Sequence, residues 1–288
     1  MQFRSNGSRR RRAVVIGAVA ALVCSAALGT AALAATAQPN AHRALKADGV
    51  GVIAHRGAAS AAPENTLASV RYGLEQDVEF VEIDVRLTKD EVPVLMHDSR
   101  VDRTTNGAGE VSKLTHRQIA KLDAGSWFSR EYRGEPVPTF DGFLDVFVPE
   151  RALAFVELKG TWRPAQIEAL LGRVEARQAS ERIVWQSFDE TTMRRLTEAS
   201  PEAARVMLTK SIDNDLVSIV DELDIDGIGA GLDLIEQHLD IVHALSDEGV
   251  ATFAYTLNDE IAWEAAETAG VDLIVTDSVS ELQQWLER

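Results

Sequence analysis

Short apolar segments rich in valine and isoleucine alternate along the chain with longer segments whose apolar residues recur every three or four positions. The short segments predict buried β-strands, and the long ones predict amphipathic helices. Such alternation is typical of a parallel sheet covered by helices. We expect nine strands, in the segments GVIAHR, EFVEIDVRL, VPVLMHD, LAFVELK, RIVWQSF, ARVMLT, DGIGAG, VATFAYT and DLIVTD.

Nine strands are one more than an eightfold barrel holds, and the second and third strands explain the excess. Only TKDE, residues 88–91, separates them, which is too short for the crossover that joins parallel strands. We therefore expect an antiparallel hairpin in which Leu95 pairs with Asp84 and His97 pairs with Glu82. The fold class that follows is α/β, a TIM (β/α)8 barrel with an early β-hairpin.

Helices are expected between the strands. The last should begin at Ser278, where Glu281 completes the sequence of a capping box. The others are expected at Glu64 to Gln76, Arg163 to Gln178, Asp189 to Ala199 and Ile235 to Glu248. The segment from Ser99 to Pro138 does not fit the repeat, so we interpret it as an insertion with a short helix near Thr115 to Leu122.

The first 37 residues are expected to be an export signal, with residues 38–50 as a linker. Arginines at positions 4 and 9–12 form a basic region, a long apolar segment follows, and Ala35-Thr36-Ala37 offers a cleavage site. The alternative is a retained membrane anchor, because the apolar segment is long enough to span a bilayer. Its many small residues favour removal, which predicts a secreted or extracytoplasmic protein without stable membrane insertion.

Removing these 37 of the 288 residues leaves 251, which suits one α/β barrel or two small domains, and no obvious linker divides them. The only cysteine, Cys24, would leave with the signal, so stability would depend on a hydrophobic core. Five of the 29 lysines and arginines would also leave, and 24 against 45 aspartates and glutamates give a formal charge of −21. This charge argues against binding to nucleic acids or anionic membranes.

Ionisable side chains gather where the early strands end. Glu82 and Asp84 alternate with apolar residues and therefore share one face of their strand, and Glu157 and Lys159 do the same after the insertion. In a barrel of parallel strands, all these ends meet at one rim. The expected site comprises His55, Arg56, Glu82, Asp84, His97, Glu157 and Lys159.

The three carboxylates at this rim would repel one another and would be costly to desolvate without a cation. We therefore expect Glu82, Asp84 and Glu157 to bind one divalent ion. Their oxygen ligands favour Ca²⁺ or Mg²⁺ over zinc, and Ca²⁺ is the first choice because exported proteins can use weak, flexible calcium sites. With Arg56, Lys159 and one phosphodiester, the charges at the site would sum to zero.

The two remaining residues, His55 and His97, titrate near neutrality. One of them can take a proton from an attacking hydroxyl or water, and the other can give a proton to the leaving alkoxide. The sequence does not decide which histidine has which role.

The chain resembles the glycerophosphodiester phosphodiesterase family in an ordered series of motifs: IAHRG, PENT, EIDVRLTKD, VLMHD, DRTTNGAGEV, LDAGSWF, VPTF, VELK, WQSFD and GVDLIVTD. The resemblance implies a barrel over residues 51–288 with an insertion at residues 99–138, and metal-dependent hydrolysis of deacylated phospholipids to an alcohol and sn-glycerol 3-phosphate. It also implies that the two histidines are the acid and the base, that the three carboxylates are metal ligands, and that Arg56 and Lys159 contact phosphate.

Two other functions are considered. A phospholipase of the D type on a related barrel keeps a similar arrangement of histidines and carboxylates, but the insertion with LDAGSWF favours the first interpretation. A secreted protein that only binds phosphodiesters is the second, and the complete acid, base and metal set argues against it. Near the site, Glu64, Asn65 and Thr66 are expected to order the first loop and cap its helix. Asp98 is expected to orient either His97 or the hairpin rather than to bind metal.

Overall fold

The computed structural model describes residues 39–46, 49–76 and 78–288, and the expected export signal lies outside the described residues. In the described part, a nine-stranded sheet has the strand order β1-β9-β8-β7-β6-β5-β4-β2-β3, and it closes because β1 also pairs with β2. The pairings within the closed ring are parallel, whereas β3 pairs antiparallel with β2. The fold is therefore the expected TIM barrel, with β3 outside the ring.

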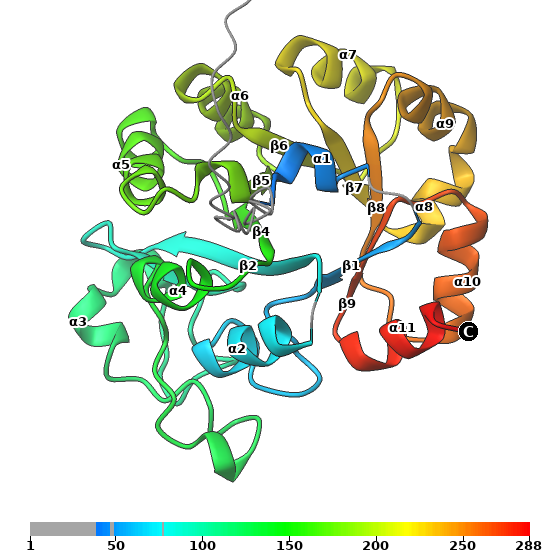
Figure 1. The fold of residues 1–288 in the computed structure, drawn as a ribbon. Helices are drawn as coiled ribbons and strands as arrows, with labels where there is room; N and C mark the ends of the chain where they lie inside the picture. Colours follow the sequence, from blue (N-terminus) through cyan, green and yellow to red (C-terminus); the bar gives the residue numbers. More distant parts are fainter. Residues whose placement is uncertain (1–38, 47–48, 77) are drawn as a thin grey trace, which may run out of the picture. The chain divides into compact units, whose positions relative to one another are not determined.

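The strands and helices follow one another along the described chain. The strands are β1 (Gly51–Ala54), β2 (Phe80–Leu87), β3 (Pro93–Leu95), β4 (Leu153–Leu158), β5 (Ile183–Ser187), β6 (Ala204–Leu208), β7 (Gly227–Ala230), β8 (Ala251–Ala254) and β9 (Leu273–Thr276). The helices are α1 (Ala41–Ala44), α2 (Leu67–Glu75), α3 (His116–Ile119), α4 (Phe140–Phe147), α5 (Pro164–Glu175), α6 (Glu190–Ala199), α7 (Asn214–Leu223), α8 (Leu232–Gln237), α9 (Leu239–Asp247), α10 (Glu260–Thr268) and α11 (Val279–Leu286). Most helices surround the strands (Figure 1). Among the described residues, no helix is both long enough and apolar enough to span a bilayer.

Two apolar cores lie on the two faces of the barrel strands. In β2, Val81 and Ile83 belong to the outer core, which the helices cover, and Phe80 belongs to the inner core. Successive side chains of a strand point to opposite faces. Glu82 and Asp84 follow Phe80 at intervals of two, so they point into the barrel, as the sequence predicted.

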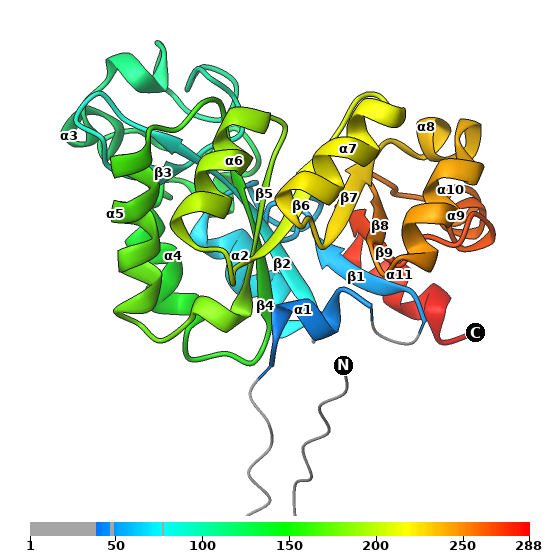
Figure 2. The ribbon, with the colours of Figure 1, turned by 90° about the horizontal axis from the view of Figure 1, so that it is seen from above.

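Helix α1 closes one end of the barrel. Ala41 and Leu45 are each 1% exposed and pack in the inner core. Asn40 is the N-cap of this helix, and its side chain accepts a hydrogen bond from the backbone N–H of Arg43. Figure 2 shows α1 at the end where the strands begin. This part of the expected linker therefore belongs to the barrel.

The insertion at residues 99–138 packs against β3 and forms with it a small separate core, in which Val101, Val111 and Ile119 are buried. Its short helix is confirmed as α3, which begins with a capping box between Thr115 and Gln118. Figure 2 shows α3 at the end of the barrel opposite to α1. The insertion therefore lies near the rim where the strands end.

The hairpin of β2 and β3 is antiparallel, as expected, but the predicted register is wrong by one residue. Leu95 pairs with Val85 and not with Asp84. His97 lies beyond the end of β3 and is not paired with Glu82.

The turn of this hairpin explains the error. The backbone N–H of Thr88 donates to the carbonyl of Val92 at 3.1 Å, so the loop has three residues and not the four that we assumed. Glu91, the last of the three, has a φ of 59°. A left-handed residue at this position is typical of three-residue hairpin loops.

The first barrel helix begins later than predicted. Asn65 has a φ of 56°, which is incompatible with a helix at that residue. Thr66 is the N-cap and accepts a hydrogen bond from the backbone N–H of Ser69, so α2 starts at Leu67.

Two predictions near the C-terminus are also wrong. The helix expected from Ile235 to Glu248 is split into α8 and α9 at His238, whose φ of −133° is not helical. Ser278 precedes α11 but makes no side-chain capping hydrogen bond, so the predicted capping box does not form. Helices α4, α7 and α10 were not among those predicted.

Candidate active site

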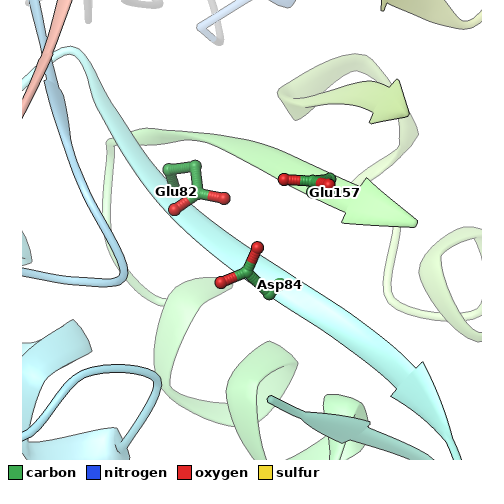
Figure 3. A group of neighbouring side chains, drawn as sticks. All are labelled: Glu82, Asp84 and Glu157. Carbon is green, nitrogen blue, oxygen red and sulfur yellow. The ribbon is translucent and has the colours of Figure 1, made fainter. Parts of the chain in front are cut away.

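The three predicted metal-binding carboxylates meet at the rim of the barrel. Figure 3 shows Glu82 and Asp84 on β2 and Glu157 on β4, with their carboxyl groups directed towards a common space. One oxygen of each lies within 4.8 Å of those of the other two, and all three residues are buried. The register explains the proximity, because Asp84 is the direct partner of Glu157 across the two strands.

All seven predicted site residues line one cavity of about 140 Å³. A single water needs about 10–15 Å³ on this measure, so the cavity has room for a small ligand. Apolar residues of the inner core, among them Phe155, Leu208 and Phe253, form part of its wall, and Tyr255 and Gln186 also contribute. The cavity therefore combines an apolar wall with a dense group of charges.

Lys159 lies between two of the carboxylates, with Nζ 2.9 Å from Oδ1 of Asp84 and 2.7 Å from Oε2 of Glu157. Burial opposes the ionisation of Asp84, but the charges of Lys159 and Arg56 outweigh it and lower the pKa of this carboxyl. Burial and repulsion from the other two carboxylates raise the pKa of Glu82 well above its usual range. Burial and repulsion from Asp84 raise the pKa of Glu157 to about 7.

The charges and the ligand atoms at the rim show whether the three carboxylates fit a metal ion. Three carboxyl groups meet two nearby cations, Arg56 and Lys159, and these two cations do not offset the burial and mutual repulsion that raise the pKa values of Glu82 and Glu157. A divalent cation would supply the missing positive charge, and oxygen ligands suit Ca²⁺ or Mg²⁺. The carboxylates therefore fit a hard divalent ion.

His55 follows β1 and is oriented by a residue that the sequence analysis did not select. Its Nδ1 lies 2.7 Å from Oδ1 of Asp277, which follows β9. Asn258 donates a hydrogen bond of 2.8 Å to the other oxygen of Asp277. Because an ionised Asp277 requires a proton on Nδ1, Nε2 of His55 is free to exchange protons with a ligand.

His97 has the same kind of partner, since its Nδ1 lies 2.8 Å from Oδ1 of Asp98, as the sequence analysis expected. Burial and the nearby charge of Lys159 lower the pKa of His97, although Asp84 and Asp98 oppose the shift. At neutral pH, His97 is therefore mainly neutral and able to accept a proton.

Arg56 reaches the carboxylates because the chain turns sharply after β1. Arg56 and Gly57 have φ values of 52° and 96°. A Cβ atom on Gly57 would lie 2.4 Å from Oγ of Ser69, so glycine is required there. The turn lets the backbone N–H of Arg56 donate to Oε2 of Glu82 at 2.9 Å, and it places Nε 3.3 Å from Oδ2 of Asp84.

The first loop contributes more to the site than capping. Nδ2 of Asn65 donates to Oδ2 of Asp84 at 2.7 Å, and Oδ1 of Asn65 accepts from the backbone N–H of Asp84 at 3.0 Å. Glu64 accepts a hydrogen bond of 2.6 Å from Arg56. In β5, Gln186 donates to Oε1 of Glu82 at 3.3 Å. Gln186 was not among the predicted site residues, although it lies in the motif WQSFD.

Comparisons with known proteins agree with this geometry. A sequence profile of the "Glycerophosphoryl diester phosphodiesterase family" matches residues 55–281. YhdW of Bacillus subtilis is 33% identical over 78% of this chain and 93% of its own length. A glycerophosphodiester phosphodiesterase of Caldanaerobacter subterraneus is 31% identical over 80% of this chain and 95% of its own.

A solved structure of an Oleispira antarctica phosphodiesterase, in complex with the product sn-glycerol-3-phosphate, is also similar. It is 29% identical, covers 83% of this chain and 97% of its own, and superposes with a TM-score of 0.73. The sequence profile matches most of the barrel, and the predicted site residues lie within or at the start of the matched region. The chain therefore belongs to the glycerophosphoryl diester phosphodiesterase family and is a glycerophosphodiester phosphodiesterase with a TIM-barrel fold.

Proposed function

We propose that this enzyme is secreted and that it hydrolyses glycerophosphodiesters to an alcohol and sn-glycerol 3-phosphate with a divalent metal ion and two histidines. The observation that carries the proposal is the single cavity that contains His55 and His97 together with the three carboxylates. The product bound in the Oleispira antarctica relative supports the same substrate class. The leader-like sequence of residues 1–37 supports secretion.

Glu82, Asp84 and Glu157 would hold the ion. When bound, the ion would neutralise charge on the phosphodiester and on the transition state. Arg56 and Lys159 line the same cavity, and their charges add to this stabilisation. Ca²⁺ is our choice over Mg²⁺, because a flexible oxygen site outside the cell suits calcium.

The two histidines would move the protons. His97, whose pKa is lowered, would accept the proton of the attacking water or hydroxyl while the new P–O bond forms. His55 would donate a proton to the leaving alkoxide as the old P–O bond breaks, and Asp277 would hold the ring of His55 in the orientation for that step. The proton removed by one histidine thus balances the proton given by the other.

The test is an assay of the purified protein with glycerophosphocholine, with and without added Ca²⁺. Calcium-dependent release of choline and sn-glycerol 3-phosphate is expected. Activity on intact phosphatidylcholine alone would favour the phospholipase alternative, and binding without turnover would favour a phosphodiester-binding protein.

A further inference from the structure

Arg103, in the insertion, contacts two carboxylates at once, each of which holds a residue of the active site. Its Nη1 and Nη2 donate to the two oxygens of Glu64 at 2.6 and 2.8 Å. Its Nε and Nη2 donate to the two oxygens of Asp98 at 2.8 and 3.0 Å. The three guanidinium nitrogens that donate these bonds lie in one plane, and a planar fork of this kind fixes both carboxylates in direction as well as distance.

Each of the two carboxylates also contacts a different residue of the active site. Glu64 also accepts a hydrogen bond from Arg56, which is one of the proposed phosphate contacts. Asp98 also binds Nδ1 of His97, one of the two proposed proton-transfer residues. Two chains of hydrogen bonds, Arg103–Glu64–Arg56 and Arg103–Asp98–His97, therefore start from one guanidinium group.

The burial of Glu64 makes its contact with Arg103 important for the site. The side chain of Glu64 is only 10% exposed, so losing one of its two cationic partners leaves a poorly solvated carboxylate. Burial opposes the ionisation of Glu64, but its hydrogen bonds with Arg103 and Arg56 outweigh it and lower its pKa. The side chains of Arg103 and Asp98 are 46% and 31% exposed, which places this connection near the mouth of the site.

We propose that Arg103 is a positioning residue that couples phosphate binding to proton transfer. It acts on Arg56 through Glu64 and on His97 through Asp98, and it touches neither substrate nor metal itself. The insertion then contributes directly to the geometry of the active site. This inference rests on the proposed roles of Arg56 and His97.

The test uses the full protein and the variants Arg103→Met, Glu64→Gln and Asp98→Asn. Two measurements follow the two active-site residues separately. The affinity for inorganic phosphate, measured by calorimetry in the presence of Ca²⁺, reports on Arg56. The value of kcat with glycerophosphocholine reports on His97. We expect Glu64→Gln to weaken phosphate binding about tenfold with a smaller effect on kcat, and Asp98→Asn to lower kcat about tenfold with phosphate binding unchanged. Arg103→Met should do both.

A triple variant separates positioning from general stabilisation. In the Glu64→Gln, Asp98→Asn background, Arg103→Met should reduce kcat/KM by less than about threefold, because residues that act as a unit are not additive. An undiminished loss in that background, or an effect of Arg103→Met on only one of the two readouts, would overturn the coupling.

Two controls complete the design. Arg100 lies in the same insertion and pairs only with Asp102 at 3.0 Å among the described residues, so Arg100→Met should change neither readout. If Arg103→Met does not fold, as judged by thermal unfolding, Arg103→Lys keeps the charge without the fork and should still reduce both readouts; normal values for both would contradict the proposal. A wild-type enzyme without phosphodiesterase activity would instead refute the proposed function.

Discussion

Nζ of Lys159 lies 2.7 Å from Oε2 of Glu157, so a cation is already in contact with one of the carboxylates that would bind metal. Lys159 does not offset burial and the repulsion from Asp84, which raise the pKa of Glu157 to about 7. The shortage of positive charge beside the three carboxylates is the basis of the first two predictions.

Removal of the metal should abolish activity without unfolding the barrel. The carboxylates lie at the rim, whereas the inner and outer apolar cores below do not depend on them. Chelation followed by dialysis should reduce kcat by at least about a hundredfold, and added Ca²⁺ should restore it. Circular dichroism should show an intact fold, and full activity after exhaustive chelation would refute the metal site.

Neutral substitutions of the three carboxylates should raise the metal concentration needed for half-maximal activity. Glu82→Gln, Asp84→Asn and Glu157→Gln each remove one ligand charge, so we expect the metal affinity to fall at least about tenfold, with most activity lost. Glu64→Gln is the matched control, because Glu64 contacts Arg56 and Arg103 and not the three predicted ligand carboxylates. Equal loss of metal affinity in Glu64→Gln would show that the ligand set is wrong.

The activities of the two histidine variants should differ on a substrate with a good leaving group. His55→Ala and His97→Ala should each lower kcat by about a hundredfold or more with glycerophosphocholine, and the double variant should be little worse. A nitrophenyl phosphodiester needs no acid, so it should restore the rate of His55→Ala and not that of His97→Ala. If only His97→Ala recovered activity, the assigned roles would be reversed. If both variants recovered activity, the assignment of one acid and one base would be refuted.

Asp98→Asn should shift the pH dependence of kcat/KM. The hydrogen bond from His97 to Asp98 raises the pKa of His97, opposing burial. Removing this carboxylate should lower the pKa of His97 further, so the acid limb of the profile should move to lower pH, while the maximal rate falls because the ring is less well oriented. A limb that moved to higher pH would indicate that another group controls it.

The class of fold and most of the candidate site could be predicted from the amino-acid sequence. The alternation of polar and apolar residues in β2 and β4 decides which side chains face inward, because the side-chain period of a strand is two in any environment. Barrel topology then brings the ends of parallel strands to one rim. Strand alternation is a local property, and the common rim is a general property of barrels. The positions of the three carboxylates and of Lys159 could therefore be predicted from the sequence.

The partners that hold these residues in place could not be predicted, because they come from distant parts of the chain. Asp277 meets His55 because β1 and β9 are neighbours in the closed barrel, although 222 positions separate the two residues. Arg103 meets Glu64 because the insertion folds back over the first loop. Contacts of this kind depend on how the ring closes and how the loops turn, which no local pattern specifies.

The register of the β2–β3 hairpin could not be predicted from the sequence either. Its existence followed from the four residues between the strands, but its register depended on the left-handed conformation of Glu91, which is uncommon for a residue with a side chain. A shift of one residue in a hairpin changes every pair across it. Sequence periodicity thus fixes the face on which a side chain lies, whereas backbone dihedral angles and chain closure fix which side chain lies opposite.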